Sequence, residues 1–305
     1  MVVEVSAIFL YPVKSCRGIP LSTATLSPTG LCWDRQWMIV NSKGKFVTQR
    51  ELPILATIEV YLPVEALDHN WSPLGTESAL CLKAPGMGLL YVPLAPSYER
   101  ERIEVTIWEW SGRAFDEGAT ASEWLSDYIG KSGLRLVRFD TEGETRPTDT
   151  RFAPGFKTAF ADGYPILLFS EASMEALNSR LPESLPLNRF RPNIVVKGCE
   201  PFEEDLWRRF SIDNHNFQGV ALCPRCKITT IDQETGKVGK EPLPTLKKFR
   251  VGQALGSNPS MRGKMYFGQN VGCEVKEGEA RTVNIGDVLH IKEKAASVSE
   301  LMVGV

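Results

Sequence analysis

Apolar and polar residues alternate through much of the first half of the chain, with the period of strands that have one buried face. Runs of this kind lie at residues 3–7, 57–61, 103–108 and 134–139. Residues 37–40 and 45–48 are also strand-like, and they flank the sequence Asn-Ser-Lys-Gly at 41–44, which is typical of a hairpin turn. The first half is therefore predicted to consist mainly of strands.

Two segments have helical spacing instead. Residues 120–129 place five apolar side chains on one helical face. Thr120 and Glu123 predict a capping box at the start of this helix, and Gly130 predicts its end. A second helix is predicted for residues 170–181. Helices are thus few compared with strands.

Further strand-like runs in the second half lie at residues 164–169, 194–196, 216–222 and 283–291. This pattern indicates an α+β fold that is mostly β and built from barrel-like domains, because a Rossmann sheet would need strands and helices to alternate. Neither a GxGxxG pattern nor a Walker A motif is present. The polar, turn-rich segment 141–155 predicts either an active-site loop or a boundary between a domain at 1–140 and one at 141–305.

Composition narrows the class of protein. Hydrophobic residues make up 43% and charged residues 24% of the 305 positions, as in ordinary globular proteins. The net charge of −2 provides no basic field that would attract nucleic acid or anionic lipid. No apolar run approaches the ~20 residues of a transmembrane segment, and seven cysteines fit a reducing compartment. We expect a soluble, intracellular protein.

Cys223 and Cys226 form the sequence Cys-Pro-Arg-Cys, between the run at 216–222 and a β-branched run at 227–231. They are therefore predicted to lie where one strand turns into another. Three interpretations remain open for the pair: a redox-active dithiol, part of a structural zinc site, or two buried apolar cysteines. The zinc interpretation lacks a second close pair of ligands, since the three histidines are scattered.

Four short polar stretches interrupt strand-like surroundings: Lys14-Ser15, Asp34-Arg35, Arg191-Pro192-Asn193 and Pro224-Arg225-Cys226. Arginine beside aromatic residues is usually a packed surface cation, and a lysine in a turn is usually only solvated. Taken together, however, these stretches supply several cations and one thiol. That combination suits a small anionic molecule bound next to a soft metal.

The sequences YPVKSCRG, WDRQWMIV, FRPNIVVKGCEPFEEDLW and CPRCKITTIDQETG resemble the molybdenum-cofactor sulfurase C-terminal (MOSC) family, and within it the amidoxime-reducing branch. The resemblance extends from about residue 5 to residue 291. It implies an N-terminal MOSC β-barrel domain followed by a MOSC β-barrel domain, with the molybdenum cofactor bound between the two.

Position by position, the resemblance implies that Cys226 supplies a thiolate to molybdenum and that Asp162 lies close to the metal and relays a proton. The residues that would hold the cofactor are Lys14, Ser15, Arg35, Arg191, Asn193, Pro224 and Arg225. Family members often have hydroxyl residues beside this aspartate, whereas this chain has Ala161 and Gly163. Cys223 is expected to be a buried residue without a role at the metal.

The implied reaction is the reduction of an N–O bond by two electrons and two protons, in amidoximes, hydroxylamines and, as a further candidate, nitrite. Cytochrome b5 and NADH-cytochrome b5 reductase are the electron donors implied by the resemblance. The alternative is a carrier of the molybdenum cofactor or of a persulfide, without reductase turnover. Sequence alone leaves the location open between mitochondria and cytosol.

Overall fold

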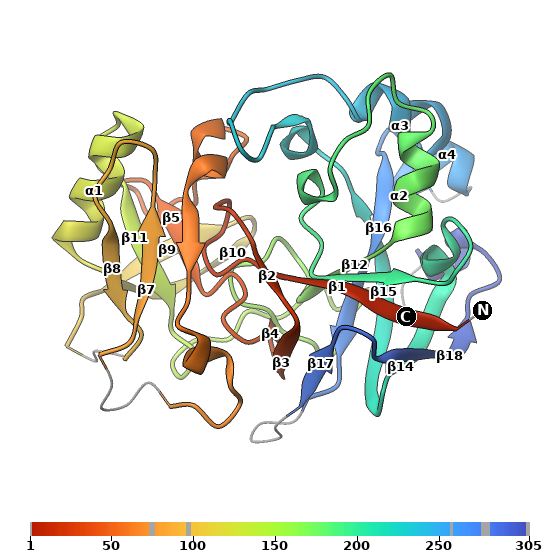
Figure 1. Ribbon diagram of the computed structural model, residues 1–305, viewed down its shortest axis with the longest axis horizontal. Helices are drawn as coiled ribbons and strands as arrows, with labels where there is room; N and C mark the ends of the chain where they lie inside the picture. Colours follow the sequence, from red (N-terminus) through yellow and green to blue (C-terminus); the bar gives the residue numbers. More distant parts are fainter. Residues whose placement is uncertain (1, 73–76, 96–98, 257–258, 276–280, 303–305) are drawn as a thin grey trace.

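In the computed structural model, which describes residues 2–72, 77–95, 99–256, 259–275 and 281–302, the chain is mostly β, as predicted. Figure 1 shows two halves side by side, with the earlier part of the chain in one and the later part in the other. The strand β1 is the exception, because it extends from the first half into the second.

Seven strands close a barrel in the second half. In order around the barrel they are β1 (Val3–Leu10), β13 (Ile194–Lys197), β12 (Ile166–Ser170), β16 (Tyr266–Cys273), β15 (His215–Pro224), β14 (Trp207–Ile212) and β18 (Val288–Lys294). Alternate residues of these strands fill one apolar core that includes Val5, Ile8, Phe210 and Val271. The predicted strands at 164–169, 194–196 and 216–222 are thus confirmed, each within a few residues.

The N-terminal strand crosses the predicted domain boundary. β1 pairs with β13 on one side and with β18 on the other, so residues 3–10 complete the barrel of the second half. At the other end of the chain, β17 (Thr282–Asn284) pairs with β3 (Thr23–Ser27). Strand pairing therefore links the predicted domains 1–140 and 141–305 at both ends of the chain. Local hydrophobicity could not predict this, because it carries no information about which distant strand completes a sheet.

The first half contains two small sheets around a second core. One is formed by β5 (Trp37–Val40), β11 (Arg135–Phe139), β10 (Trp110–Asp116) and β9 (Arg102–Ile107), and the other by β6 (Glu59–Tyr61), β7 (Ala79–Lys83) and β8 (Leu90–Pro93). β2 (Ile19–Leu21) extends the barrel sheet, and β4 (Gly30–Leu31) pairs with β3.

Strand β5 is buried on both faces. Trp37 and Ile39 face the core shared by the two small sheets, whereas Met38 and Val40 face a separate cluster that includes Phe160. This second cluster attaches the segment just before Asp162 to the first half of the molecule.

The longer predicted helices are confirmed, but the capping box is wrong. Helix α1 (Ala119–Ile129) begins at Ala119 after Gly118, so Thr120 is inside the first turn and caps nothing, while Gly130 ends the helix in the left-handed conformation. Helix α2 (Glu171–Asn178) is capped by Ser170, whose hydroxyl accepts from the Ser173 amide.

The remaining helices are α3 (Leu243–Phe249), α4 (Gly252–Leu255) and α5 (Val298–Leu301). The 3-10 helices are η1 (Pro53–Thr57), η2 (Val64–Leu67), η3 (Leu187–Arg189), η4 (Glu203–Leu206), η5 (Lys227–Thr230) and η6 (Pro259–Met261).

Two strand predictions near the end of the chain are wrong. The β-branched run after Cys226 forms η5, because the hydroxyl groups of Thr229 and Thr230 donate to the carbonyls of Cys226 and Lys227 and close a tight turn. The run at 283–291 is two strands, β17 and β18, separated by a turn at Gly286 with φ of 93°.

In the part of the chain that the structure describes, no helix is long and apolar enough to cross a membrane.

Two acidic residues are buried beside the barrel. Glu204 is 1% exposed and Asp205 is 2% exposed. Asp205 pairs with the buried Arg250 at 2.6 Å. Glu204 accepts from the Ser170 hydroxyl at 3.0 Å and has no ion pair within the described residues. Burial and the neighbouring Asp205 raise the pKa of Glu204 to about 7.

Because the pKa of Glu204 is higher in the folded than in the unfolded chain, the folded state holds an extra proton between about pH 4.5 and 7. The free energy of unfolding should therefore fall as the pH rises through this window. We expect Glu204→Gln to remove this fall and to stabilise the protein at pH 8 by about 1–3 kcal/mol. Urea unfolding at pH 5 and pH 8 measures this, with the exposed Glu183→Gln as control. An equal loss of stability at both pH values would contradict it.

Candidate active site

One cleft is lined by residues from both halves of the chain, and all nine residues that the resemblance marked are among them. They are Lys14, Ser15, Arg35, Asp162, Arg191, Asn193, Pro224, Arg225 and Cys226. Several of them lie at strand ends: β1 ends four residues before Lys14, β13 begins directly after Asn193, and β15 ends two residues before Cys226. The strands therefore fix where these short polar stretches meet.

The backbone at the cleft is held in uncommon conformations. Seven non-glycine residues of the described chain have positive φ, and three of them line the cleft: Ser15 at 70°, Arg35 at 47° and Arg191 at 58°. Such conformations cost roughly 1–3 kcal/mol each and concentrate at functional sites. The surrounding contacts must offset this cost to aim these side chains into the cleft.

The thiol of Cys226 is half-buried and accepts from the Nε of Arg50 at 3.3 Å. The same guanidinium reaches Asp162 at 3.4 Å and lies over the ring of Trp108, with 5.0 Å between its carbon and the ring centroid. Arg50 therefore connects the two residues that the sequence marks for chemistry.

Sequence reasoning missed Arg50 and Trp108. Trp108 is at the turn between β9 and β10, has φ of 52°, and donates from its indole nitrogen to Asp162 at 3.3 Å. Neither residue belongs to the motifs that carry the resemblance. No local sequence pattern marks Arg50, because its contacts are with Cys226 and Asp162, which the fold brings close from distant parts of the chain.

Asp162 forms a short ion pair in the cleft. Its carboxylate lies 2.5 Å from the Nζ of Lys14, which also donates to the Phe160 carbonyl at 2.9 Å. Loss of water works to raise the pKa of Asp162, but Lys14 and Arg50 outweigh this and hold it far below its usual range. Burial lowers the pKa of Lys14 to about 8, although Asp162 opposes the shift. In this pair the lysine, and not the aspartate, carries the proton.

A buried network orders Arg35. Asp34 is 4% exposed and accepts from Arg35 at 2.5 Å and from the Asn193 amide at 3.0 Å. Burial raises the pKa of Asp34, and the charge of Arg35 opposes this shift. Asn193 uses both donors and its oxygen on protein groups, since it also donates to the Phe9 carbonyl and accepts from Arg35 and the Leu167 amide. Its contacts in this structure position Arg35.

Tyr11 supports two of the cations. The guanidinium carbons of Arg35 and Arg191 both lie 4.3 Å from the centroid of its ring. Arg35 also donates to the Arg191 carbonyl at 3.3 Å. The negative face of an aromatic ring stabilises a cation most strongly where water is excluded. Tyr11, the first residue of the YPVK sequence, thus joins cations from both halves of the chain.

Two buried donors in the cleft have no protein partner among the described residues. These are the Nη2 atom of Arg191 and the Nε atom of Arg225. Burial also lowers the pKa of Arg191 to about 10, which shows how little compensation its charge receives. Unpartnered guanidinium donors in a concave site are suited to an anionic ligand such as a phosphate.

Cys223 differs from its prediction. It is half-buried and lines the cleft, and its sulfur accepts from the Nη1 of Arg225 at 2.9 Å. Desolvation raises its thiol pKa. Cys223 lies near the end of β15 and lines the cleft, and it is not part of the apolar core of the barrel. Within the described residues no group of three or more His, Cys, Asp and Glu side chains could hold a metal ion.

Comparison with known families explains this arrangement. The model of the MOSC N-terminal beta barrel domain matches residues 2–132, and the model of the MOSC domain matches residues 156–290. The chain belongs to the MOSC family. The cleft is lined by residues from both matched segments, and strand β1 of the first segment pairs with strands of the second.

Relatives in the MOSC family are similar over most of the chain. Mitochondrial amidoxime reducing component 2 of Rattus norvegicus is 32% identical over 94% of this chain and 82% of the rat protein. Mitochondrial amidoxime-reducing component 1 of Homo sapiens is 33% identical over the same shares. The molybdenum cofactor sulfurase of Danio rerio is 32% identical over 81% of this chain but only 30% of its own length. These names associate the family with the molybdenum cofactor and with amidoxime reduction.

The contact between Tyr11 and the two arginines can be tested by stability. Tyr11→Phe retains the ring, whereas Tyr11→Leu removes the negative face that supports both guanidinium groups. We expect the leucine variant to be less stable than the phenylalanine variant by about 1–3 kcal/mol, from the cation–π contacts and the imperfect packing of the smaller side chain. Chemical denaturation of both variants measures the difference. Equal stability would mean that the ring acts only as apolar volume.

Proposed function

We propose that this chain binds the molybdenum cofactor in the cleft and reduces N–O bonds of small N-hydroxylated compounds. The observation that carries the proposal is the pairing of one half-buried thiol, held by Arg50, with two buried guanidinium donors that lack partners. A soft thiolate and unpartnered cations together match a metal carried on an anionic organic ligand. A metal bound by Cys226 would obtain its other ligands from that cofactor.

The residues divide the task by their chemistry. Cys226 would supply the thiolate ligand, and Arg50 would stabilise its negative charge. Arg191 and Arg225 offer free donors to the anionic part of the cofactor, and Arg35 adds a third cation. Lys14, Ser15, Asn193 and Pro224 complete the lining of the cleft. When bound, the cofactor supplies a metal that can exchange two electrons with a substrate.

Reduction of R–NHOH consumes two electrons and two protons and yields R–NH2 and water. We assign the proton supply to Lys14, because its ammonium has a pKa of about 8, whereas Asp162 is held ionised. Asp162, whose side chain is 54% exposed, accepts from the Lys14 Nζ and so orients this ammonium. The earlier interpretation of Asp162 as the proton donor is thereby revised to that of a partner.

The electron donors belong to the proposal as well. Cytochrome b5 and NADH-cytochrome b5 reductase are the donors that the resemblance implies, and a haem protein would deliver the two electrons one at a time. Nitrite is a further candidate substrate, since it also contains N–O bonds.

The competing function is a carrier that holds the cofactor or a persulfide on Cys226 without turnover. The name of the sulfurase relative supports keeping that alternative.

The test is metal content together with turnover. Protein from a host that makes the cofactor should contain about one molybdenum per chain and reduce benzamidoxime with cytochrome b5, its reductase and NADH. Cys226→Ala should lose both metal and activity because the thiolate is removed, whereas Cys223→Ala, three residues earlier near the end of β15, should keep both. Circular dichroism checks that each variant is folded.

Stoichiometric molybdenum without turnover would support the carrier and overturn the reductase. A folded wild-type chain without molybdenum and pterin would overturn the cofactor assignment itself. Full activity of Cys226→Ala would show that the thiol is not the ligand.

The role of Lys14 predicts a pH dependence. The turnover number should fall as the pH rises through about 8, because the neutral amine can no longer donate a proton. Since the Asp162 carboxylate raises the pKa of Lys14, Asp162→Asn should move this fall to lower pH. Asp213→Asn is the control, because Asp213 lies in the turn between β14 and β15, at the opposite end of β15 from Pro224, in a left-handed conformation that tolerates asparagine. An unchanged pH profile in Asp162→Asn would exclude Lys14 as the titrating donor.

A further inference from the structure

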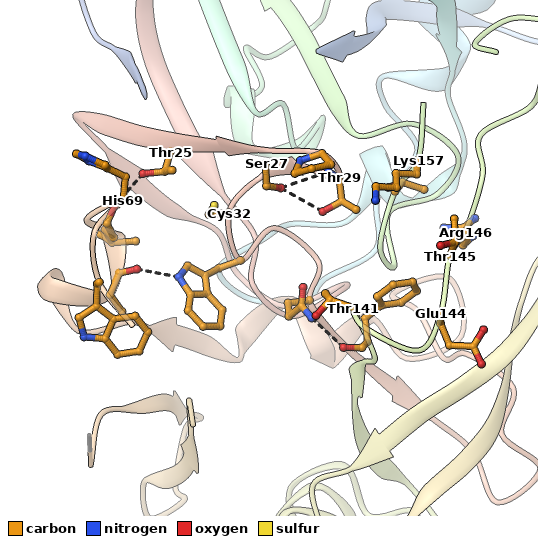
Figure 2. A pocket seen from close by; sticks show the side chains of 18 of the residues that line it. Thr25, Ser27, Thr29, Cys32, His69, Thr141, Glu144, Thr145, Arg146 and Lys157 are labelled. Carbon is orange, nitrogen blue, oxygen red and sulfur yellow. Dashed lines mark hydrogen bonds between the residues drawn. The ribbon is translucent and has the colours of Figure 1, made fainter. Parts of the chain in front are cut away.

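The molecule has a second cavity of about 330 Å³, and none of the residues that line this cavity lines the cleft. Figure 2 shows it between the segments that carry Thr25 to Cys32 on one side and Thr141 to Arg146 on the other. Its volume falls within the range of small-molecule sites. The cavity and the cleft share two segments of the chain, residues 32–36 and 157–162. Some side chains of each segment line the cavity and others line the cleft.

One end of this second cavity is aromatic. Trp33 and Trp71 line it, with ring centroids 5.9 Å apart and planes at 60° to each other. Trp33 is fixed from behind because it stacks on the buried Trp37 and donates its indole proton to the Ala66 carbonyl at 2.8 Å. The stacking and the hydrogen bond hold this indole ring in place, and it forms an apolar part of the cavity wall.

The other end carries a cation and a free hydroxyl. Lys157 is half-buried, and no ion pair or hydrogen bond of its ammonium occurs within the described residues. The neighbouring Thr158 is 1% exposed, and its hydroxyl has no partner there. Figure 2 shows Lys157 on the side of the cavity away from His69. A half-buried ammonium next to an unpartnered hydroxyl is a pair of donors without an acceptor.

The remaining charged groups of the cavity already have partners. Arg146 donates to the carbonyls of Ala159, Ala161 and Asp162. Glu144 accepts from the Arg113 amide at 2.9 Å, and Asp68 accepts from the Asn70 amide at 2.7 Å. Lys157 is therefore the charged group of the cavity whose charged atom makes no hydrogen bond or ion pair within the described residues.

We propose that this second cavity is a binding site for a small aromatic carboxylate. The flat ring would pack on Trp33 and Trp71, and the carboxylate would accept from the Lys157 Nζ and the Thr158 hydroxyl. The indole wall recognises the ring through its large apolar area, and the charge-assisted bond selects the anion over a neutral analogue. The site is independent of the proposed reductase function, since it uses none of the residues of the cleft.

The test compares an acid with its neutral counterpart by isothermal titration calorimetry. 2-Naphthylacetate should bind the full-length protein at about tenfold higher affinity than 2-naphthylacetamide, because only the acid can accept a charge-assisted bond. Lys157→Gln should remove this preference, and the exposed Lys131→Gln should retain it. Equal affinity for the two compounds, or no binding at all, would overturn the proposal.

The cations of the cleft could also attract the acid, so the location needs its own measurement. The Cys32 thiol lines the second cavity and is half-buried. 2-Naphthylacetate should slow its alkylation by N-ethylmaleimide severalfold in the wild type but not in Lys157→Gln, as read by peptide mass spectrometry. Arg50→Gln should leave the affinity unchanged. Loss of binding in Arg50→Gln with unprotected Cys32 would place the acid in the cleft and refute the site.

Discussion

The cleft depends on the compensation of several cations that are buried close to one another. Arg35 and Arg191 would repel each other if they met in a low-dielectric space without partners. The ring of Tyr11 lies within 4.3 Å of both guanidinium carbons, and the buried Asp34 balances one of the charges. Enough positive charge remains uncompensated to leave donors free for a ligand. The same arrangement thus offsets the repulsion between the cations and keeps donors for a ligand.

The strand β1 connects this electrostatic arrangement to the fold. Residues 3–10 complete the barrel of the second half, and the next residues, beginning with Tyr11, belong to the cleft. The Phe9 amide bonds to the Asn193 carbonyl at 2.8 Å, which fixes the start of the YPVK turn against the barrel. Because one continuous segment serves both halves, the two sides of the cleft are held in register by covalent connection as well as by packing.

Much of the site could be predicted from sequence because its residues belong to contiguous motifs. Lys14, Arg191 and Cys226 each lie within a long, ordered pattern, and the structure brings all nine marked residues to one cleft. The strands with regular alternation were predicted for the same local reason. The run after Cys226 was not, because its threonine hydroxyls compete with strand pairing by bonding to the backbone.

The sequence by itself determined the family, the mostly β class and the set of side chains that could bind an anion and a metal, since these depend on residue type and local spacing. The tertiary structure alone decided that β1 closes the second barrel and that Arg50 reaches Cys226 across 176 sequence positions. It also decided the proton positions of the Lys14–Asp162 pair. Those properties follow from burial and from charges brought close by distant parts of the chain, and no local pattern encodes either.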